Sequence, residues 1–196
     1  MHDCWASYWN YGDIQHSVCC AHLLRELTGI SENHPEQKWS SKFIDLLIEM
    51  KKTKEKAIEE GKDALNSEQI QQFDMRYDNL IEQARIENPI QEPSEKKRGR
   101  KKKGKILALV ECLANYKASV CLFLQDFKVP FDNNQAERDR RMIKVKTKVS
   151  GCFRTEEGAR AYLKIMSYVG TARKQGYSVY EAIKNALLGN SEFIFA

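Results

Sequence analysis

The chain has 196 residues, of which 42% are hydrophobic and 30% are charged, and its formal net charge is +5. This composition can bury the core of one or two domains and excludes a disordered tail. The sequence has no apolar run of about 18 residues and no basic N-terminal segment followed by an apolar stretch, which argues against a membrane span and a secretion signal. We therefore predict a cytoplasmic protein that has no membrane partner.

The first twenty residues are rich in aromatic side chains and in residues that favour strands. A turn is predicted at Gly12-Asp13, followed by a short strand over residues 14–19 and a helix over Ala21–Leu27 that Gly29 should end. A domain seldom begins with polar and aromatic residues directly after its first Met, since apolar strand residues normally precede them. This start therefore suggests the interior of a larger domain.

Apolar residues at helical spacing predict two long helices, over Lys38–Glu60 and from about Ser67 to Glu87. Gly61 is expected to end the first helix, and Asn66 is expected to cap the second. Because the connection is short, the two helices should form an antiparallel hairpin.

A basic segment follows over residues 89–105. The stretch from Asn88 to Lys105 holds two prolines, two glycines and eight basic side chains, a composition that cannot offset the entropy of folding by burial. We predict a mobile loop in which Lys101 and Lys102 contact DNA, although such charges are often only solvated. Helix is predicted again over Ile106–Tyr116 and residues 119–125.

Three further helices are predicted towards the C-terminus. The first begins at the Asp132-Asn133 pair, which can cap it, and runs to about Lys148. The second covers Glu156–Lys174, and Ser178 with Glu181 should form a capping box for the last helix. Glycines are expected to end these helices, at Gly151, Gly176 and Gly189.

The first of these helices carries a carboxylate beside a row of basic residues. Glu137 lies one turn into the helix, and Arg141, Lys144 and Lys148 follow on much the same side, next to Arg138. One interpretation is an exposed ion pair between Glu137 and Arg141, worth a few tenths of a kcal/mol. The functional interpretation is that Glu137 binds a metal ion while the cations bind DNA phosphates.

The six cysteines show no disulfide-like spacing, so we expect them to be reduced and mostly to serve as small core residues. The sequence Cys19-Cys20-Ala21-His22 leaves a zinc site open as a further alternative, although neither a Cys-x-x-Cys nor a His-x-x-x-His pair accompanies it. The candidate zinc ligands are His2, Cys4, His16, Cys19, Cys20 and His22.

Several short blocks in this order resemble the insertion-sequence-66 family of transposases, and the resemblance extends from Asp3 to Gly189. The blocks are His2-Asp3-Cys4-Trp5, Cys19-x-x-His22-Leu23-Leu24-Arg25-Glu26-Leu27, Pro130-Phe131-Asp132-Asn133-Asn134-x-Ala136-Glu137-Arg138, Lys146-Thr147-Lys148-Val149-Ser150-Gly151-Cys152-Phe153-Arg154, and Gly158-Ala159.

The resemblance implies phosphoryl transfer on DNA by a ribonuclease H-like core, in which two Asp residues and one Glu hold two divalent metal ions, Mg²⁺ or Mn²⁺. Asp3 matches the second acid and Glu137 the third, so both are expected to be catalytic metal ligands that converge. Cys19 and His22 match a motif expected to organise the active site. The first Asp would lie upstream of Met1, which predicts a transposase fragment that is inactive alone.

The expected fold is α+β and predominantly helical. Residues 1–35 and 126–155 would form the partial ribonuclease H-like core, residues 36–125 a helical insertion, and residues 156–196 the C-terminal helices. The expected partner is DNA, as element ends and as target in the bacterial nucleoid, and self-association stays open. The alternative function is that of a non-catalytic, basic, helical nucleic-acid-binding protein.

Overall fold

The computed structural model describes residues 1–89 and 104–195 of the chain. The predicted basic loop, including Lys101 and Lys102, therefore lies almost entirely outside the described residues. The chain divides into two compact units, Met1–Asn134 and Gln135–Ala196, which are described separately below.

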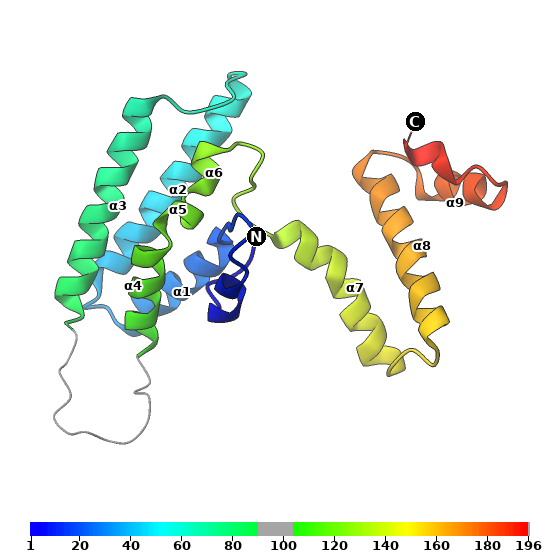
Figure 1. Cartoon of the computed structure of the whole chain (residues 1–196), viewed down its shortest axis with the longest axis horizontal. Coiled ribbons are helices and arrows are strands. Elements are labelled where there is room, and N and C mark those ends of the chain that lie inside the picture. The colour runs from blue at the N-terminus through cyan, green and yellow to red at the C-terminus, as the bar shows by residue number, and fades with distance from the viewer. Residues whose placement is uncertain (90–103, 196) are drawn as a thin grey trace. The chain divides into compact units, whose positions relative to one another are not determined.

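The first unit is built on an antiparallel pair of long helices, as the sequence predicts. Helices α2 (Lys38–Glu59) and α3 (Ser67–Glu87) lie side by side in Figure 1, with α1 (Cys20–Asn33) packed against α2 and α4 (Lys105–Asn115) against α3. The predicted cap of α3 is confirmed, because the Asn66 side chain accepts a hydrogen bond from the Gln69 amide over 2.7 Å.

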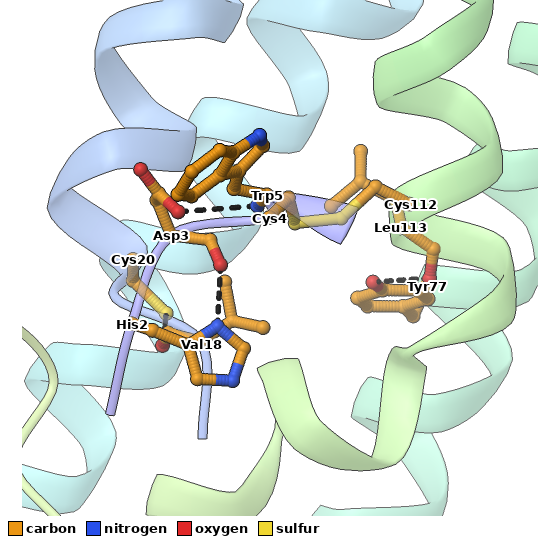
Figure 2. The surroundings of a disulfide bond; sticks show 9 residues. All are labelled: His2, Asp3, Cys4, Trp5, Val18, Cys20, Tyr77, Cys112 and Leu113. Atoms are coloured by element: carbon orange, nitrogen blue, oxygen red, sulfur yellow. Dashed lines mark hydrogen bonds between the residues drawn. A yellow bond between two sulfur atoms is a disulfide. The ribbon is translucent and has the colours of Figure 1, made fainter. Parts of the chain in front are cut away.

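The core of this unit lies between these four helices. Trp39, Phe43 and Tyr77 are fully buried, and the rings of Phe43 and Tyr77 meet edge to face with centroids 4.8 Å apart. The Tyr77 hydroxyl donates a hydrogen bond to the Leu113 carbonyl over 2.9 Å (Figure 2). This buried hydrogen bond fixes the position of α3 along α4.

Two short helices, α5 (Lys117–Val120) and α6 (Leu122–Gln125), lead to an irregular segment that a buried lysine holds in place. The Lys54 ammonium of α2 donates a hydrogen bond to the Val129 carbonyl over 2.6 Å and lies 5.4 Å from the centre of the Phe127 ring. Burial lowers the pKa of Lys54. The segment that precedes Asp132 is thereby attached to the helical hairpin.

The N-terminal part differs from the sequence prediction. Residues 14–19 were expected to form a strand, but in the described ranges the strand-like pairing is limited to one isolated parallel bridge between His2 and Val18. The physical reason is that the Val18 amide donates to the Ser119 carbonyl and the Cys19 amide to the His2 carbonyl, and the chain then enters α1, so no ladder can extend. The predominantly helical class is confirmed, whereas the ribonuclease H-like sheet is not.

Helix α1 is also longer than predicted, because it continues through Gly29 to Asn33 instead of ending there. The extra turn buries Ile30, and burial of that side chain offsets the roughly 1 kcal/mol that an interior glycine costs a helix.

The second unit contains most of α7 (Asn134–Ser150), followed by α8 (Glu156–Lys174), α9 (Val179–Leu187) and the short 3₁₀ helix η2 (Ser191–Phe195). Gly151 has a φ of +74°, which confirms the predicted end of α7. The small core of this unit consists of Ala172, Ala182 and Ile194.

The predicted capping box of α9 is wrong. The Ser178 side chain makes no capping hydrogen bond, and the Glu181 carboxylate instead lies 3.7 Å from the Lys184 ammonium. A carboxylate that turns towards a cation one helical turn ahead is not available to the cap behind it. None of the helices in the described ranges is both long enough and apolar enough to cross a membrane.

Candidate functional site

Three blocks that are far apart in the sequence meet around Cys19 in the first unit. The Cys19 amide donates a hydrogen bond to the His2 carbonyl over 2.8 Å, and the Cys20 amide donates one to the Phe131 carbonyl over 3.1 Å. The Asn133 amide donates to the Cys19 Sγ atom over 3.3 Å. One residue therefore joins the Asp3 segment, the start of α1 and the segment that leads into α7.

The turn before α7 has its own cap. The Asp132 carboxylate accepts a hydrogen bond from the Asn134 amide over 3.0 Å, which confirms the capping role predicted for the Asp132-Asn133 pair. The Phe131 ring packs edge to face on Phe123, with centroids 5.1 Å apart. The predicted Pro-Phe-Asp-Asn block thus contributes an apolar anchor and a helix cap.

Asp3 is half-buried at the N-terminal end of the unit. Its Oδ1 atom accepts a hydrogen bond from the Trp5 amide over 3.1 Å, and Figure 2 shows the other carboxylate oxygen pointing away from that contact. Within the described ranges, that second oxygen has no hydrogen-bond donor. A carboxylate held through one oxygen with the other available has the hard-oxygen character that Mg²⁺ and Mn²⁺ bind, so Asp3 fits a metal-ligand role.

Two histidines hold the segment around Asp3. The His2 Nδ1 atom contacts the Asp3 carbonyl oxygen, and the His2 Nε2 atom lies 2.8 Å from the His16 Nδ1 atom. The His16 Nε2 atom lies 2.8 Å from the Tyr11 carbonyl oxygen, and the His2 ring stacks on Tyr8 with centroids 4.6 Å apart. Ring stacking and hydrogen bonds thus order a short segment that has little buried apolar surface.

The expectation of six reduced cysteines is wrong for one pair, because Cys4 and Cys112 form a disulfide (Figure 2). These residues are 108 positions apart in the sequence, and the fold brings their Cα atoms to 6.4 Å. Sequence spacing could not reveal this pair, since only the packing of the N-terminal segment on α4 creates it. Cys19, Cys20 and Cys121 are buried thiols, as predicted.

This arrangement argues against four of the six candidate zinc ligands and leaves Cys19 and His22, whose possible ligand atoms lie within 4.8 Å of each other. Cys4 is bonded to Cys112, and the rings of His2 and His16 are engaged with each other and with carbonyl oxygens. Burial also raises the pKa of Cys20, which opposes the thiolate form that zinc requires. The six candidate ligands therefore do not act as one set.

A cavity of about 840 Å³ opens beside Asp3, between the N-terminal segment, α1 and α4. Asp3 and Glu26 both line it, together with the basic side chains of Arg25 and Lys105. Partial burial, and secondly the negative charge of Asp3, raise the pKa of Glu26. In this cavity, the negative charge of Asp3 therefore acts on the carboxylate of Glu26.

The predicted basic residues of α7 are all exposed. Arg138, Arg141, Lys144 and Lys148 lie at the surface, and none of the residues of α7, a helix described in full, is buried. Glu137 is half-buried in the first turn of the helix. The second unit thus presents a helix whose cations are accessible to an anionic partner.

Another acidic residue of α7, Asp139, forms an ion pair with Lys174 of α8. This pair links two helices of the second unit. Its partner holds the pKa of Asp139 below the usual range, mainly through the hydrogen bond from Lys174. Asp139 therefore has a structural role, because its ion pair with Lys174 joins α7 to α8.

Sequence reasoning missed three residues of the first unit that shape the candidate site. Glu26 and Trp5 both stand inside recognised blocks, yet nothing in the spacing showed that they border the same cavity as Asp3. In the sequence, Lys54 is typical of a solvated lysine on the exposed side of a long helix. Its place at a buried heptad-like position, four residues after Met50, was the available signal.

Comparison with known proteins gives one result. The model of a protein family described as the IS66 family of transposases matches residues 1–161 of the chain. None of the curated proteins and none of the solved structures compared matches it.

Proposed function

The chain belongs to the IS66 family of transposases, and from this premise we propose that it acts in DNA transposition through Asp3 and Glu137 as ligands of catalytic divalent metal ions. The observation that carries the proposal is the convergence of the His2-Asp3 segment, the Cys19 block and the Phe131-to-Asn133 segment in one unit. These are the blocks that carry the family resemblance.

Cys19 and His22 are proposed to organise the site rather than to take part in bond breaking. Cys19 is buried, and its backbone and Sγ atoms connect the Asp3 segment to the segment that leads into α7. His22 lies in the first turn of α1, immediately after this junction. Loss of the junction would allow the Asp3 segment to move, which matters because metal ligands must be held closely to their working geometry.

The metal ions are Mg²⁺ or Mn²⁺ in this proposal, held by carboxylate oxygens of Asp3 and Glu137. When bound, a pair of such ions supplies activation of the attacking oxygen and charge stabilisation of the leaving oxygen in displacement at phosphorus. The chain itself contributes a carboxylate fixed through the Trp5 amide. It also contributes the buried junction at Cys19, which restrains that carboxylate.

The DNA backbone is proposed to contact the exposed cations Arg138, Arg141, Lys144 and Lys148 of α7. Support comes from their exposure and from their position on the helix that carries Glu137. Lys101 and Lys102 belong to the same proposal as further phosphate contacts. Contacts of this kind position DNA without reading its sequence.

The fold assignment is part of the proposal. We infer that the His2–Val18 bridge is the remnant of a ribonuclease H-like sheet, and that residues 1–35 and 126–155 belong to that core. Residues 36–125 would then be the helical insertion and residues 156–196 the C-terminal helices. The alternative of a non-catalytic nucleic-acid-binding protein is not favoured, because the family match is to transposases.

Isothermal titration calorimetry with Mn²⁺ tests the assignment of Asp3 and Glu137 as metal ligands. We expect saturable binding by the wild-type protein, weakened at least about 10-fold by Asp3→Asn and by Glu137→Gln, equivalent to about 1.4 kcal/mol each. The matched controls Asp13→Asn and Glu157→Gln alter exposed acids outside the proposed site and should leave the affinity unchanged. Equal affinities for the wild-type protein and both site variants would refute the assignment.

A further inference from the structure

We propose that the cavity beside Asp3 binds a single unpaired nucleotide of a DNA strand, with the Trp5 indole as the stacking surface for the base. The inference rests on the proposed function, because it names the form of DNA that approaches the Asp3 carboxylate. The size of the cavity, its aromatic and apolar walls, and the charged groups around it support this inference.

The size of the cavity fits one nucleotide and excludes a double helix. Its volume is about 840 Å³, within the range of about 300–1,000 Å³ typical of pockets for small ligands. A duplex is too wide to enter a pocket of this class, so a base must leave its stack or come from a single strand. The cavity therefore distinguishes unpaired from paired DNA by shape alone.

The walls offer the two kinds of surface that a base face requires. Trp5 lines the cavity and is 64% exposed, although its backbone amide is held by the Asp3 carboxylate over 3.1 Å. Its ring is steadied by an edge-to-face contact with Tyr8, with centroids 5.9 Å apart. Ile30 and Leu109 form an apolar wall, so a base can stack on the indole and still bury its remaining surface.

The charged groups fit the two ends of a nucleotide. Arg25 and Lys105 line the cavity and are exposed, where they can contact phosphates of the strand. The Glu26 carboxylate can accept a hydrogen bond from an exocyclic amino group of a base. If Trp5 served only in packing, neither the cations nor a carboxylate would be needed beside it.

Binding of a short, fluorescently labelled single strand, measured by anisotropy in EDTA, tests the inference. Trp5→Ala should weaken binding about 10-fold, since base–aromatic stacking contributes roughly 1–3 kcal/mol per base. Trp5→Phe keeps an aromatic face and should recover most of the affinity. The control Tyr180→Ala removes an aromatic side chain that is 73% exposed in the second unit, and it should have no effect.

The salt dependence provides a second readout. Arg25→Gln and Lys105→Gln should each reduce the slope of log affinity against log salt concentration by about 0.7, the value expected for each phosphate of a single strand that a cation neutralises. A blunt duplex of the same sequence should compete poorly and should bind Trp5→Ala as well as it binds the wild-type protein. A free nucleoside monophosphate should compete far less than the strand.

The inference is overturned if the wild-type protein shows no saturable binding of the single strand, or if Trp5→Ala binds it with wild-type affinity. Equal losses for the single strand and the duplex would also overturn it, because they would indicate a general change in the protein. Competition by the free nucleotide at the affinity of the strand would reassign the cavity to a small ligand. These results are independent of the metal titration, because EDTA chelates divalent metal ions and thereby prevents phosphoryl transfer.

Discussion

The backbone amide of Asn133 donates a hydrogen bond to the Sγ atom of Cys19 over 3.3 Å, across 114 positions of sequence. Cys19 is fully buried, so its sulfur is not a solvent-exposed reactive group but an acceptor at the junction of the two segments. The contact explains how a cysteine at the start of α1 can influence the position of the turn that leads into α7.

Substitution of Cys19 tests this junction. Cys19→Ala removes the acceptor and leaves the half-buried Asn133 amide without its partner, which should lower the free energy of unfolding by about 1–3 kcal/mol. Cys19→Ser retains an acceptor and should recover part of the loss. Urea unfolding followed by circular dichroism provides the measurement, and a Cys19→Ala variant as stable as the wild-type protein would contradict the proposed junction.

Reduction of the Cys4–Cys112 disulfide should destabilise the first unit. The bond closes a loop across 108 positions of sequence, and loss of a disulfide that closes a long loop typically costs about 2–5 kcal/mol, in part because the unfolded chain gains freedom. Urea unfolding with and without dithiothreitol measures the effect. The double variant Cys4→Ser/Cys112→Ser serves as the control and should not respond to the reductant.

The reactivity of the cysteines provides a separate check on the fold. Native, unreduced protein should take up one equivalent of iodoacetamide, at the exposed Cys152. Cys19, Cys20 and Cys121 are buried, and burial raises the pKa of Cys121 to about 12, which suppresses its thiolate. Mass spectrometry of the peptides identifies the sites, and labelling of Cys20 or Cys121 in native protein would show that this core is open.

Neutralising α7 should weaken DNA binding in a salt-dependent manner. Lys144→Gln/Lys148→Gln should reduce the slope of log affinity against log salt concentration by about 0.9 for each phosphate of duplex DNA that is no longer neutralised. The control Lys52→Gln/Lys56→Gln removes the same charge from exposed positions of α2 and should have a smaller effect. Equal slopes for the two double variants would place the DNA contacts elsewhere.

Acid should remove a small electrostatic contribution from the helical hairpin. Arg76 of α3 donates two hydrogen bonds to Glu49 of α2, over 2.7 and 2.6 Å, and mainly through them lowers the pKa of Glu49. The folded-state pKa is thus below the unfolded one. The stabilisation is therefore present above the ordinary glutamate pKa of 4.5 and is lost as the pH falls through the folded-state pKa.

The magnitude is limited because both side chains are about half exposed, so solvent screens the pair. Glu49→Gln should cost about 0.5 kcal/mol at neutral pH and nothing at low pH. Thermal unfolding across this pH range measures the difference. Glu59→Gln, at an exposed position of the same helix, is the control, and a Glu49→Gln penalty that persists in acid would show that the effect is not electrostatic.

The sequence by itself determined the long helices and their ends. The helices over Lys38–Glu59 and Ser67–Glu87 follow from apolar residues at helical spacing, and Asn66 and Gly61 mark the turn between them. These signals are local, because a cap or a left-handed glycine acts within one helical turn. The short blocks around Asp3, Cys19 and Asp132 could also be identified in the sequence, and they indicated the family.

Only the tertiary structure decided which distant residues meet. The Cys4–Cys112 bond, the hydrogen bond from Asn133 to Cys19, and the buried Lys54 all depend on the packing of segments that no local pattern relates. The strand expected over residues 14–19 failed for the same reason. A strand needs a neighbour to complete its hydrogen bonds. Among the described residues, Val18 has a single β-bridge, to His2, and its own amide donates to Ser119 before the chain turns into α1.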